Sequence, residues 1–299
     1  MIIIEAYTRT DLAMEAHELW RVNEDRCSDY SGVKSKTERI QGFSLTTVEI
    51  LDENAARELS KPIGKYITFE LDALMKREEN SFVDAVGILA AQLSDIISDT
   101  DGDVMIVGLG NEAITPDAIG PKALESVLAT RHLKQQMPTE FLSFRSVSLI
   151  EAGVLGTTGV ESAELVKAIV DRIKPSLVIA IDALASCKTE RLCRTVQIAD
   201  TGIVPGSGIG NSRLALNHES LGVPVIAVGV PTVVDAMTII SEYISGKGLD
   251  LPDLDEKNAM IVTPRDIDKN VHDISKLIGY AINVALHKGL TVADVDMFL

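Results

Sequence analysis

LVIAIDAL, residues 177–184, is the segment that decides the fold: an apolar run over 177–181 leads directly to Asp182. Two further runs have the same character: VMIVGLG at residues 104–110 and VPVIAVGV at residues 223–230. Strands that are apolar on both faces are typical of parallel sheets covered by helices on each side. The chain is therefore predicted to be an α/β protein whose mostly parallel sheet carries helices on both faces.

On either side of these runs, short apolar segments alternate with segments of helical periodicity, which is the βαβ pattern. We expect strands at about 43–51, 65–71, 103–108, 144–150, 177–182, 195–199 and 223–229. We expect helices near 12–23, 79–99, 119–133, 160–173, 232–245 and 271–288. Residues 1–299 are expected to form one domain with edge additions, and the acidic, turn-rich stretch 246–262 a surface loop or lobe.

Composition limits the class of protein. The 299 residues include 28 Lys and Arg against 44 Asp and Glu, a formal net charge of −16. Such a charge repels nucleic-acid phosphates and anionic membranes, so neither is expected as a direct partner. The start, MIIIEAY, has no basic region and too short an apolar run for a signal peptide, and no run approaches the roughly 20 apolar residues of a membrane span. A cytoplasmic location is expected.

Two carboxylates follow two of the buried strands. Asp117 comes after 104–110, and Asp182 ends the apolar run that begins at Leu177. Each could cap or complement a nearby helix, with Thr115 as N-cap in the first case. If the strands are neighbours, however, both side chains enter one crevice at the carboxyl edge of the sheet. Two close carboxylates share a proton, so that one can activate a water while the other donates a proton. A hard metal ion could instead bridge them.

Glycine-rich loops line the same predicted edge, at 151–162 and 200–213. Glycine lets a backbone approach a ligand closely. Gly108, Gly110 and Ala113 also fit a dinucleotide fingerprint, which leaves a nucleotide-dependent oxidoreductase as an alternative. Pro116 weakens it because it delays the helix that should follow the glycines. A catalytically silent protein that binds basic partners is a third hypothesis.

Several long motifs together resemble the germination protease family, the spore proteases of spore-forming bacteria. They are RTDLAMEA (9–16), GLGNEAITPDAIGPKALESVLATRHL (108–133), GVLGTTGVES (153–162), PSLVIAIDALAS (175–186), ADTGIVPGSGIGN (199–211), GVPVIAVGVPTVVDAMTI (222–239) and ALHKGLTVADVDMFL (285–299).

The resemblance implies an endopeptidase, grouped with the aspartic peptidases, that degrades small acid-soluble spore proteins at germination. It implies a zymogen, a homotetramer located in the forespore and spore core, and a fold similar to hydrogenase-maturation endopeptidases. The catalytic aspartates carry over to Asp117 and Asp182. No metal or other cofactor is expected, although a metal-dependent maturation-type endopeptidase remains an alternative.

The resemblance also gives a meaning to residues 9–16. The family cuts after an acid in a T-E-apolar-A-x-E context and removes its own N-terminal segment at a similar sequence, which predicts a propeptide of residues 1–11 cut between Asp11 and Leu12. Asp11 could instead cap a helix that begins at Leu12. The expected peptide-binding residues are Gly110, Asn111, Gly153, Gly156, Thr158, Gly159, Gly206 and Gly208.

Overall fold

The computed structural model describes residues 10–23, 32–97, 100–207, 213–245 and 260–299. Within these ranges the strands form one nine-stranded sheet in the order β1-β2-β3-β7-β8-β6-β4-β5, and β9 pairs with the end of β8. The strands are β1 (Val33–Ile40), β2 (Phe43–Ile50), β3 (Gly64–Glu70), β4 (Val104–Leu109), β5 (Val147–Gly153), β6 (Leu177–Ala185), β7 (Thr195–Ala199), β8 (Val225–Asp235) and β9 (Ile261–Val262).

The sheet is mixed, which corrects the expectation of a mostly parallel one. The four strands β8, β6, β4 and β5 are parallel to one another. The remaining pairings, β1 with β2, β2 with β3, β3 with β7, β7 with β8 and β8 with β9, are antiparallel. The three long apolar runs lie in the parallel half, where helices cover both faces. They therefore predicted the strands of that half correctly, but they contain no information about the antiparallel half.

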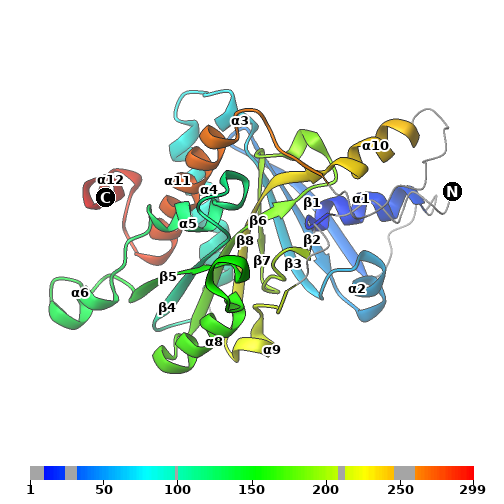
Figure 1. Ribbon diagram of the computed structural model, residues 1–299. Coiled ribbons are helices and arrows are strands. Elements are labelled where there is room, and N and C mark those ends of the chain that lie inside the picture. Colours follow the sequence, from blue (N-terminus) through cyan, green and yellow to red (C-terminus); the bar gives the residue numbers. More distant parts are fainter. Residues whose placement is uncertain (1–9, 24–31, 98–99, 208–212, 246–259) are drawn as a thin grey trace.

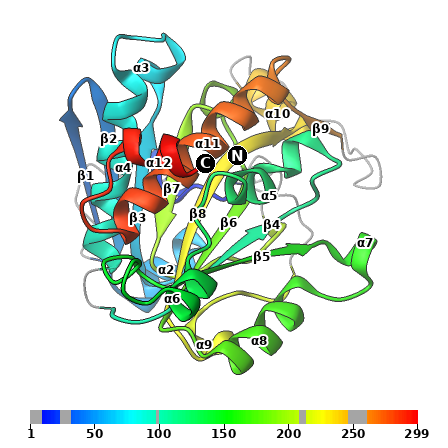
Figure 2. The same ribbon diagram turned by 90° about the vertical axis from the view of Figure 1, so that its left-hand side faces the viewer.

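Helices cover both faces of the sheet (Figures 1 and 2). One face packs against α4, α5 and α11, and the other against α8 and α9 in the parallel half and against α1 and α2 in the antiparallel half. The helices are α1 (Ala13–Asn23), α2 (Glu53–Leu59), α3 (Asp72–Met75), α4 (Ser81–Ile97), α5 (Ile119–Leu124), α6 (Arg131–Gln136), α7 (Leu155–Thr158), α8 (Ser162–Ile173), α9 (His218–Leu221), α10 (Ala236–Ser245), α11 (Ile267–Leu286) and α12 (Val292–Phe298), with short 3-10 turns η1 (Thr115–Asp117) and η2 (Thr189–Arg191).

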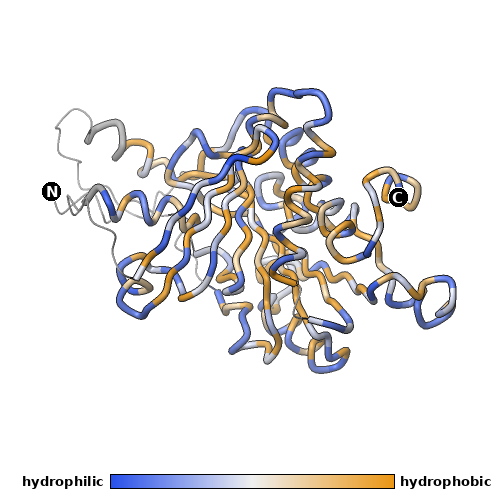
Figure 3. Tube along the Cα trace, turned by 180° about the vertical axis from the view of Figure 1, so that it is seen from behind, coloured by the Kyte–Doolittle hydropathy of each residue, from blue (hydrophilic) through white to orange (hydrophobic). Residues whose placement is uncertain are grey.

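The core consists of the strands and the helix faces turned toward them, which Figure 3 shows as apolar segments running through the centre of the molecule. Ala163, Val166 and Val170 recur at helical spacing on α8 and are buried against β4 and β6. On the opposite face α5 approaches β4 very closely, because a Cβ on Gly108 would lie 2.7 Å from the carbonyl oxygen of Gly120. Helix packing therefore accounts for Gly108, which the dinucleotide fingerprint had assigned to a ligand.

Several elements differ from the sequence-based expectations. The expected elements did not include β1, β9 or the helices α2, α3, α7, α9 and α12, and the helix expected over 119–133 is two short helices, α5 and α6. The expected helix 232–245 begins only at Ala236, because β8 continues to Asp235. Of the expected acidic loop, residues 246–259 lie outside the described residues, while Ile261 and Val262 form β9.

Candidate functional site

The carboxyl ends of β4 and β6 border a cavity of about 400 Å³. The two strands are parallel neighbours, with Gly108 paired to Ile181. Asp117 follows β4 at the end of η1, and Asp182 lies within β6, three residues before its end rather than beyond it as expected. Both aspartates line the cavity. The condition for the predicted pair, adjacent strands, is thus met.

The backbone around Gly110 holds Asp117 in place. Asn111 N donates to a carboxylate oxygen of Asp117 at 2.8 Å and to its carbonyl oxygen at 3.1 Å. Gly110 has φ +108°, and a Cβ there would lie 1.9 Å from the carbonyl oxygen of Asp117, so only glycine fits. Burial raises the pKa of Asp117, although the Asn111 hydrogen bond and the charge of Arg213 act in the opposite direction.

Asp182 is only 5% exposed and accepts one hydrogen bond, from Ala183 N at 2.9 Å. Burial raises the pKa of Asp182 well above its ordinary value. The negative charges of Asp117 and, to a lesser extent, Asp11 raise it further, while the Ala183 hydrogen bond opposes them. Asp182 therefore holds its proton at pH values where ordinary carboxyls have lost theirs, which gives the pair unequal acidities.

Asp11 also lines this cavity and is bound along the end of β6. Its backbone N donates to Ala185 O at 2.9 Å, and Ala185 N donates to its carboxylate at 2.8 Å. Ser207 Oγ donates to the other carboxylate oxygen at 2.6 Å. These bonds lead away from α1, so Asp11 is held by the cavity wall and is not a helix cap. The expected Thr115 cap is likewise not formed, because η1 has no side-chain cap bond.

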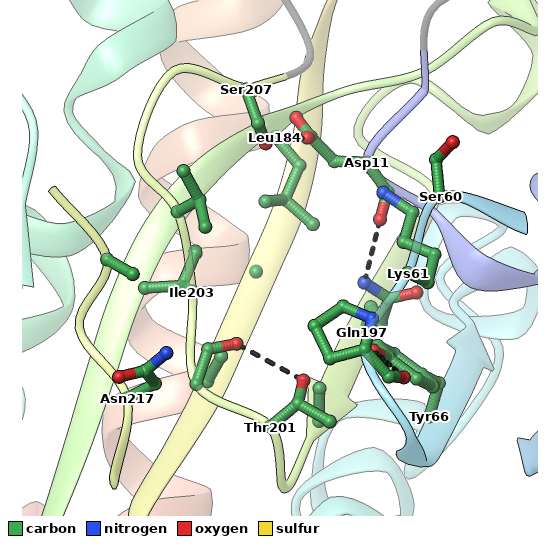
Figure 4. Close-up of a pocket in the computed structure, with 17 residues that line it drawn as sticks. Asp11, Ser60, Lys61, Tyr66, Leu184, Gln197, Thr201, Ile203, Ser207 and Asn217 are labelled. Atoms are coloured by element: carbon green, nitrogen blue, oxygen red, sulfur yellow. Dashed lines mark hydrogen bonds between the residues drawn. The ribbon is translucent and has the colours of Figure 1, made fainter. Parts of the chain in front are cut away.

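The residues on either side of Asp11 are also fixed by hydrogen bonds and by burial. Gln197 Nε2 donates to the carbonyl oxygen of Asp11 at 3.2 Å (Figure 4). Gln197 Oε1 accepts from Ala13 N at 2.8 Å, so this side chain bridges Asp11 and Ala13 on either side of Leu12. Leu12 and Ala13 are fully buried. Lys61 Nζ donates to the carbonyl oxygen of Thr10 at 3.0 Å.

A second cavity, of about 310 Å³, adjoins the first at Asp11 and Leu184. Figure 4 shows Asp11, Leu184 and Ser207 at one end of it, with Thr201 and Asn217 at the other. Asp11 thus lies between two hollows, one of which contains the aspartate pair.

The expected peptide-binding residues are placed unevenly. Gly110 and Gly206 line the cavity of the aspartate pair, and Asn111 binds Asp117. Gly208 lies outside the described residues. Val154, in the connection between β5 and α8, and Ser162, the first residue of α8, also line this cavity. The other four predicted residues, Gly153, Gly156, Thr158 and Gly159, belong to the same connection but are not among the residues that line either cavity at Asp11.

Sequence reasoning missed Gln197 and Ser207. The signal for Gln197 was a long polar residue inside the apolar strand TVQIA, where it is 7% exposed and would be costly without partners. Ser207 lies in the predicted Gly-rich loop, but nothing local indicates that its hydroxyl reaches residue 11.

Within the described residues, no group of three or more His, Cys, Asp and Glu side chains is placed to hold a metal ion. In the same part of the chain, every helix is too short or too polar to cross a bilayer.

Comparison with known proteins gives a consistent result. A family model described as germination protease matches residues 11–246. The chain is 42% identical to a germination protease of Caldanaerobacter subterraneus subsp. tengcongensis, with all of both chains covered. It is 41% identical to one from Clostridium perfringens strain 13, over 97% of this chain and 98% of the relative. It is 35% identical to one from Bacillus cereus strain AH187, over 93% of each.

Proposed function

The chain belongs to the germination protease family, and from this premise we propose that it is an endopeptidase that cleaves after acidic residues with Asp117 and Asp182. We propose that it is made as a zymogen that cuts its own Asp11–Leu12 bond. The observation that carries the proposal is that Asp11 is bound in the cavity lined by both aspartates, with its carbonyl oxygen held by Gln197.

The unequal acidities of the two aspartates suggest their roles. Asp117, the less perturbed carboxylate, takes a proton from a water as the water oxygen attacks the carbonyl carbon of Asp11. Asp182 supplies its proton to the nitrogen of Leu12 as the C–N bond breaks. Gln197 Nε2 donates to the oxygen on which negative charge develops, so it stabilises the tetrahedral intermediate.

The hydrogen bonds to the Asp11 side chain also explain why an acidic residue would be selected before the cleaved bond. The carboxylate of Asp11 accepts from a backbone N–H and a hydroxyl, Ala185 N and Ser207 Oγ. Hydrogen bonds to a charged acceptor are about twice as strong as neutral ones. An amide in that position would present an N–H₂ group to a donor, which disfavours Asn and Gln.

The remaining parts of the proposal are supported by family membership and charge. The substrates are small acid-soluble spore proteins, degraded in the forespore and spore core, and the enzyme assembles as a homotetramer without nucleic acid or membrane as a direct partner. Residues 1–299 act as one peptidase domain, of which 1–11 is the propeptide, with a fold similar to hydrogenase-maturation endopeptidases.

The test uses full-length protein with Asp117→Asn or Asp182→Asn, incubated at mildly acidic pH and followed by intact mass spectrometry. Wild type should lose residues 1–11, and both variants should stay uncut. Asp171→Asn, an exposed residue of α8, is the matched control and should be cut like wild type. Cleavage at Asp11 in either active-site variant would contradict the assignment.

A further inference from the structure

Lys61 carries an amine that the proposed cleavage chemistry does not use. It lines the cavity that adjoins the cavity of the aspartate pair at Asp11. Its Nζ donates to the carbonyl oxygen of Thr10 at 3.0 Å, and in the described part of the chain this oxygen is the one acceptor of the amine. The side chain therefore binds the peptide backbone one residue before the acid that precedes the proposed cut.

The end of a helix fixes the position of Lys61. The residue follows Ser60, the C-cap of α2, which has a left-handed φ of 52°, and Lys61 N donates to Ala56 O at 3.1 Å. Burial lowers the pKa of Lys61, although the negative charges of Asp11 and Glu15 act in the opposite direction. The amine is thus partly removed from water, where a donor without an acceptor is costly.

The peptide group between Thr10 and Asp11 is bound at both of its polar atoms. Its carbonyl oxygen accepts from Lys61, and its N–H donates to Ala185 O at 2.9 Å. The carbonyl and the N–H of a trans peptide group point in opposite directions, so the two contacts together fix the orientation of its plane. Figure 4 shows Lys61 close to Asp11 and Gln197. This peptide group thus sets how the next carbonyl, the one proposed to be attacked, is presented.

Loss of residues 1–11 would leave the amine of Lys61 without its acceptor, because Thr10 leaves with them. The next polypeptide in the cleft can supply a carbonyl oxygen at the same place whatever its sequence, since the carbonyl belongs to the backbone. A chain that begins with the acid cannot. It presents a free ammonium there, which lacks the acceptor and is repelled by the charge of Lys61.

We propose that Lys61 and the carbonyl oxygen of Ala185 form a clamp for the peptide group that precedes the cleaved acid in a substrate. Lys61 is then a positioning residue that restricts cleavage to acids with a residue before them. The ligand of the clamp is a backbone amide of any sequence. The inference rests on the proposed function, because it assigns residues 10 and 11 the binding mode of a substrate.

The first experiment measures the clamp without cleavage. Hydrogen–deuterium exchange of residues 10–15 is followed by mass spectrometry in full-length Asp117→Asn protein, with and without a second substitution. Lys61→Met should speed this exchange about tenfold or more, because a hydrogen bond from a charged donor is lost. Lys65→Met, on β3, is the matched control and should leave it unchanged. Equal exchange with and without Lys61→Met would overturn the proposal, and thermal unfolding shows that the variants are folded.

The second experiment measures specificity in chains that have lost residues 1–11. The substrates are the peptide DLAMEAH, residues 11–17, with an acetylated or a free N-terminus, and succinyl-LAMEAH, which has neither the carbonyl nor the ammonium. The kcat/KM for the acetylated peptide should exceed both others by about tenfold or more. Lys61→Met should reduce both ratios severalfold, whereas Lys61→Arg should retain most of the preference. Ratios that are the same in Lys61→Met and wild type would overturn the assignment.

The two experiments separate this inference from the proposed function. If the wild-type chain never cuts at Asp11 but Lys61→Met releases residues 10–15 in the exchange measurement, the cleavage proposal fails and the clamp stands. If self-cleavage occurs but Lys61→Met changes neither the exchange nor the peptide ratios, the reverse holds.

Discussion

Asp182 and Gln197 flank Gly229 in the sheet, each paired with it from a neighbouring strand. Paired residues on neighbouring strands project from the same face of the sheet. The side chains of Asp182 and Gln197 therefore stand on one face, separated by Gly229, which has no side chain. The Asp11–Leu12 bond is bound on this face, with Gln197 on its carbonyl oxygen. The relationship gives the cleft an acid on one side and an amide donor on the other.

Replacing Gln197 tests the amide donor. Gln197→Ala should slow self-cleavage by about 10²–10³-fold, the usual effect of losing one donor to a developing oxyanion. The rate is measured by mass spectrometry, and thermal unfolding shows whether the fold survives. Thr68→Val is the matched control, because Thr68 is paired with Gln197 on β3 and is buried, and it should cut at the wild-type rate.

Self-cleavage should accelerate as the pH falls from 8 toward 5. Burial and the charge of Asp117 raise the pKa of Asp182, so a falling pH increases the fraction of chains that carry the proton donated in the proposed mechanism. Initial rates of loss of residues 1–11 across the series measure the effect. A flat profile would show that no proton on the pair limits the reaction.

Asp182 should cost the protein stability at neutral pH. Near pH 4, where an aspartate in the unfolded chain titrates, native Asp182 is still protonated; as the pH rises, the unfolded chain releases its proton first and the native state is penalised. Asp182→Asn removes this penalty. Its free energy of unfolding should exceed that of wild type at pH 7.5, because the uncharged amide carries no ionisation penalty in the buried site.

At pH 5 the gain in free energy of unfolding from Asp182→Asn should be smaller. Both comparisons are made by urea unfolding of freshly purified full-length protein. Asp171→Asn, exposed on α8, should show no gain at either pH. A gain for Asp182→Asn that is the same at both pH values would mean that ionisation of Asp182 is not its cause.

The acid before the cut can be tested in the chain itself. Asp11→Asn should slow self-cleavage more than tenfold, because its amide offers N–H groups where Ser207 and Ala185 donate. Ser207→Ala should slow it by about tenfold, since one hydrogen bond to a charged group is lost. Identification of the new N-terminus measures both rate and position, and equal rates for Asp11→Asn and wild type would contradict acid selection.

Gly110 should tolerate no side chain. Gly110→Ala forces a Cβ against the carbonyl of Asp117 at a positive φ, so we expect loss of self-cleavage and a free energy of unfolding lower by about 2 kcal/mol or more. Gly87→Ala, where nothing lies within 4 Å on helix α4, should stabilise by about 0.5–1 kcal/mol and leave cleavage unchanged. Circular dichroism and mass spectrometry of both variants provide the measurements.

Much of the parallel half was predictable from the sequence. The apolar runs at β4, β6 and β8 indicated strands covered on both faces. The carboxyl ends of such strands meet at one edge, which predicted that Asp117 and Asp182 share a crevice if β4 and β6 are neighbours, as they are. The strand β1 was missed because seven of its eight residues are exposed, so it carries no apolar pattern.

The family, the strands of the parallel half and the candidate aspartates could be predicted from the sequence, because each corresponds to a continuous run of residues. Contacts between distant segments, in contrast, place β7 between β3 and β8 and hold residues 10–15 against Gln197 of β7, Ser186 and Arg191. Strand order depends on which buried surfaces fit together, and residues more than 170 positions apart carry no local pattern that records their contact.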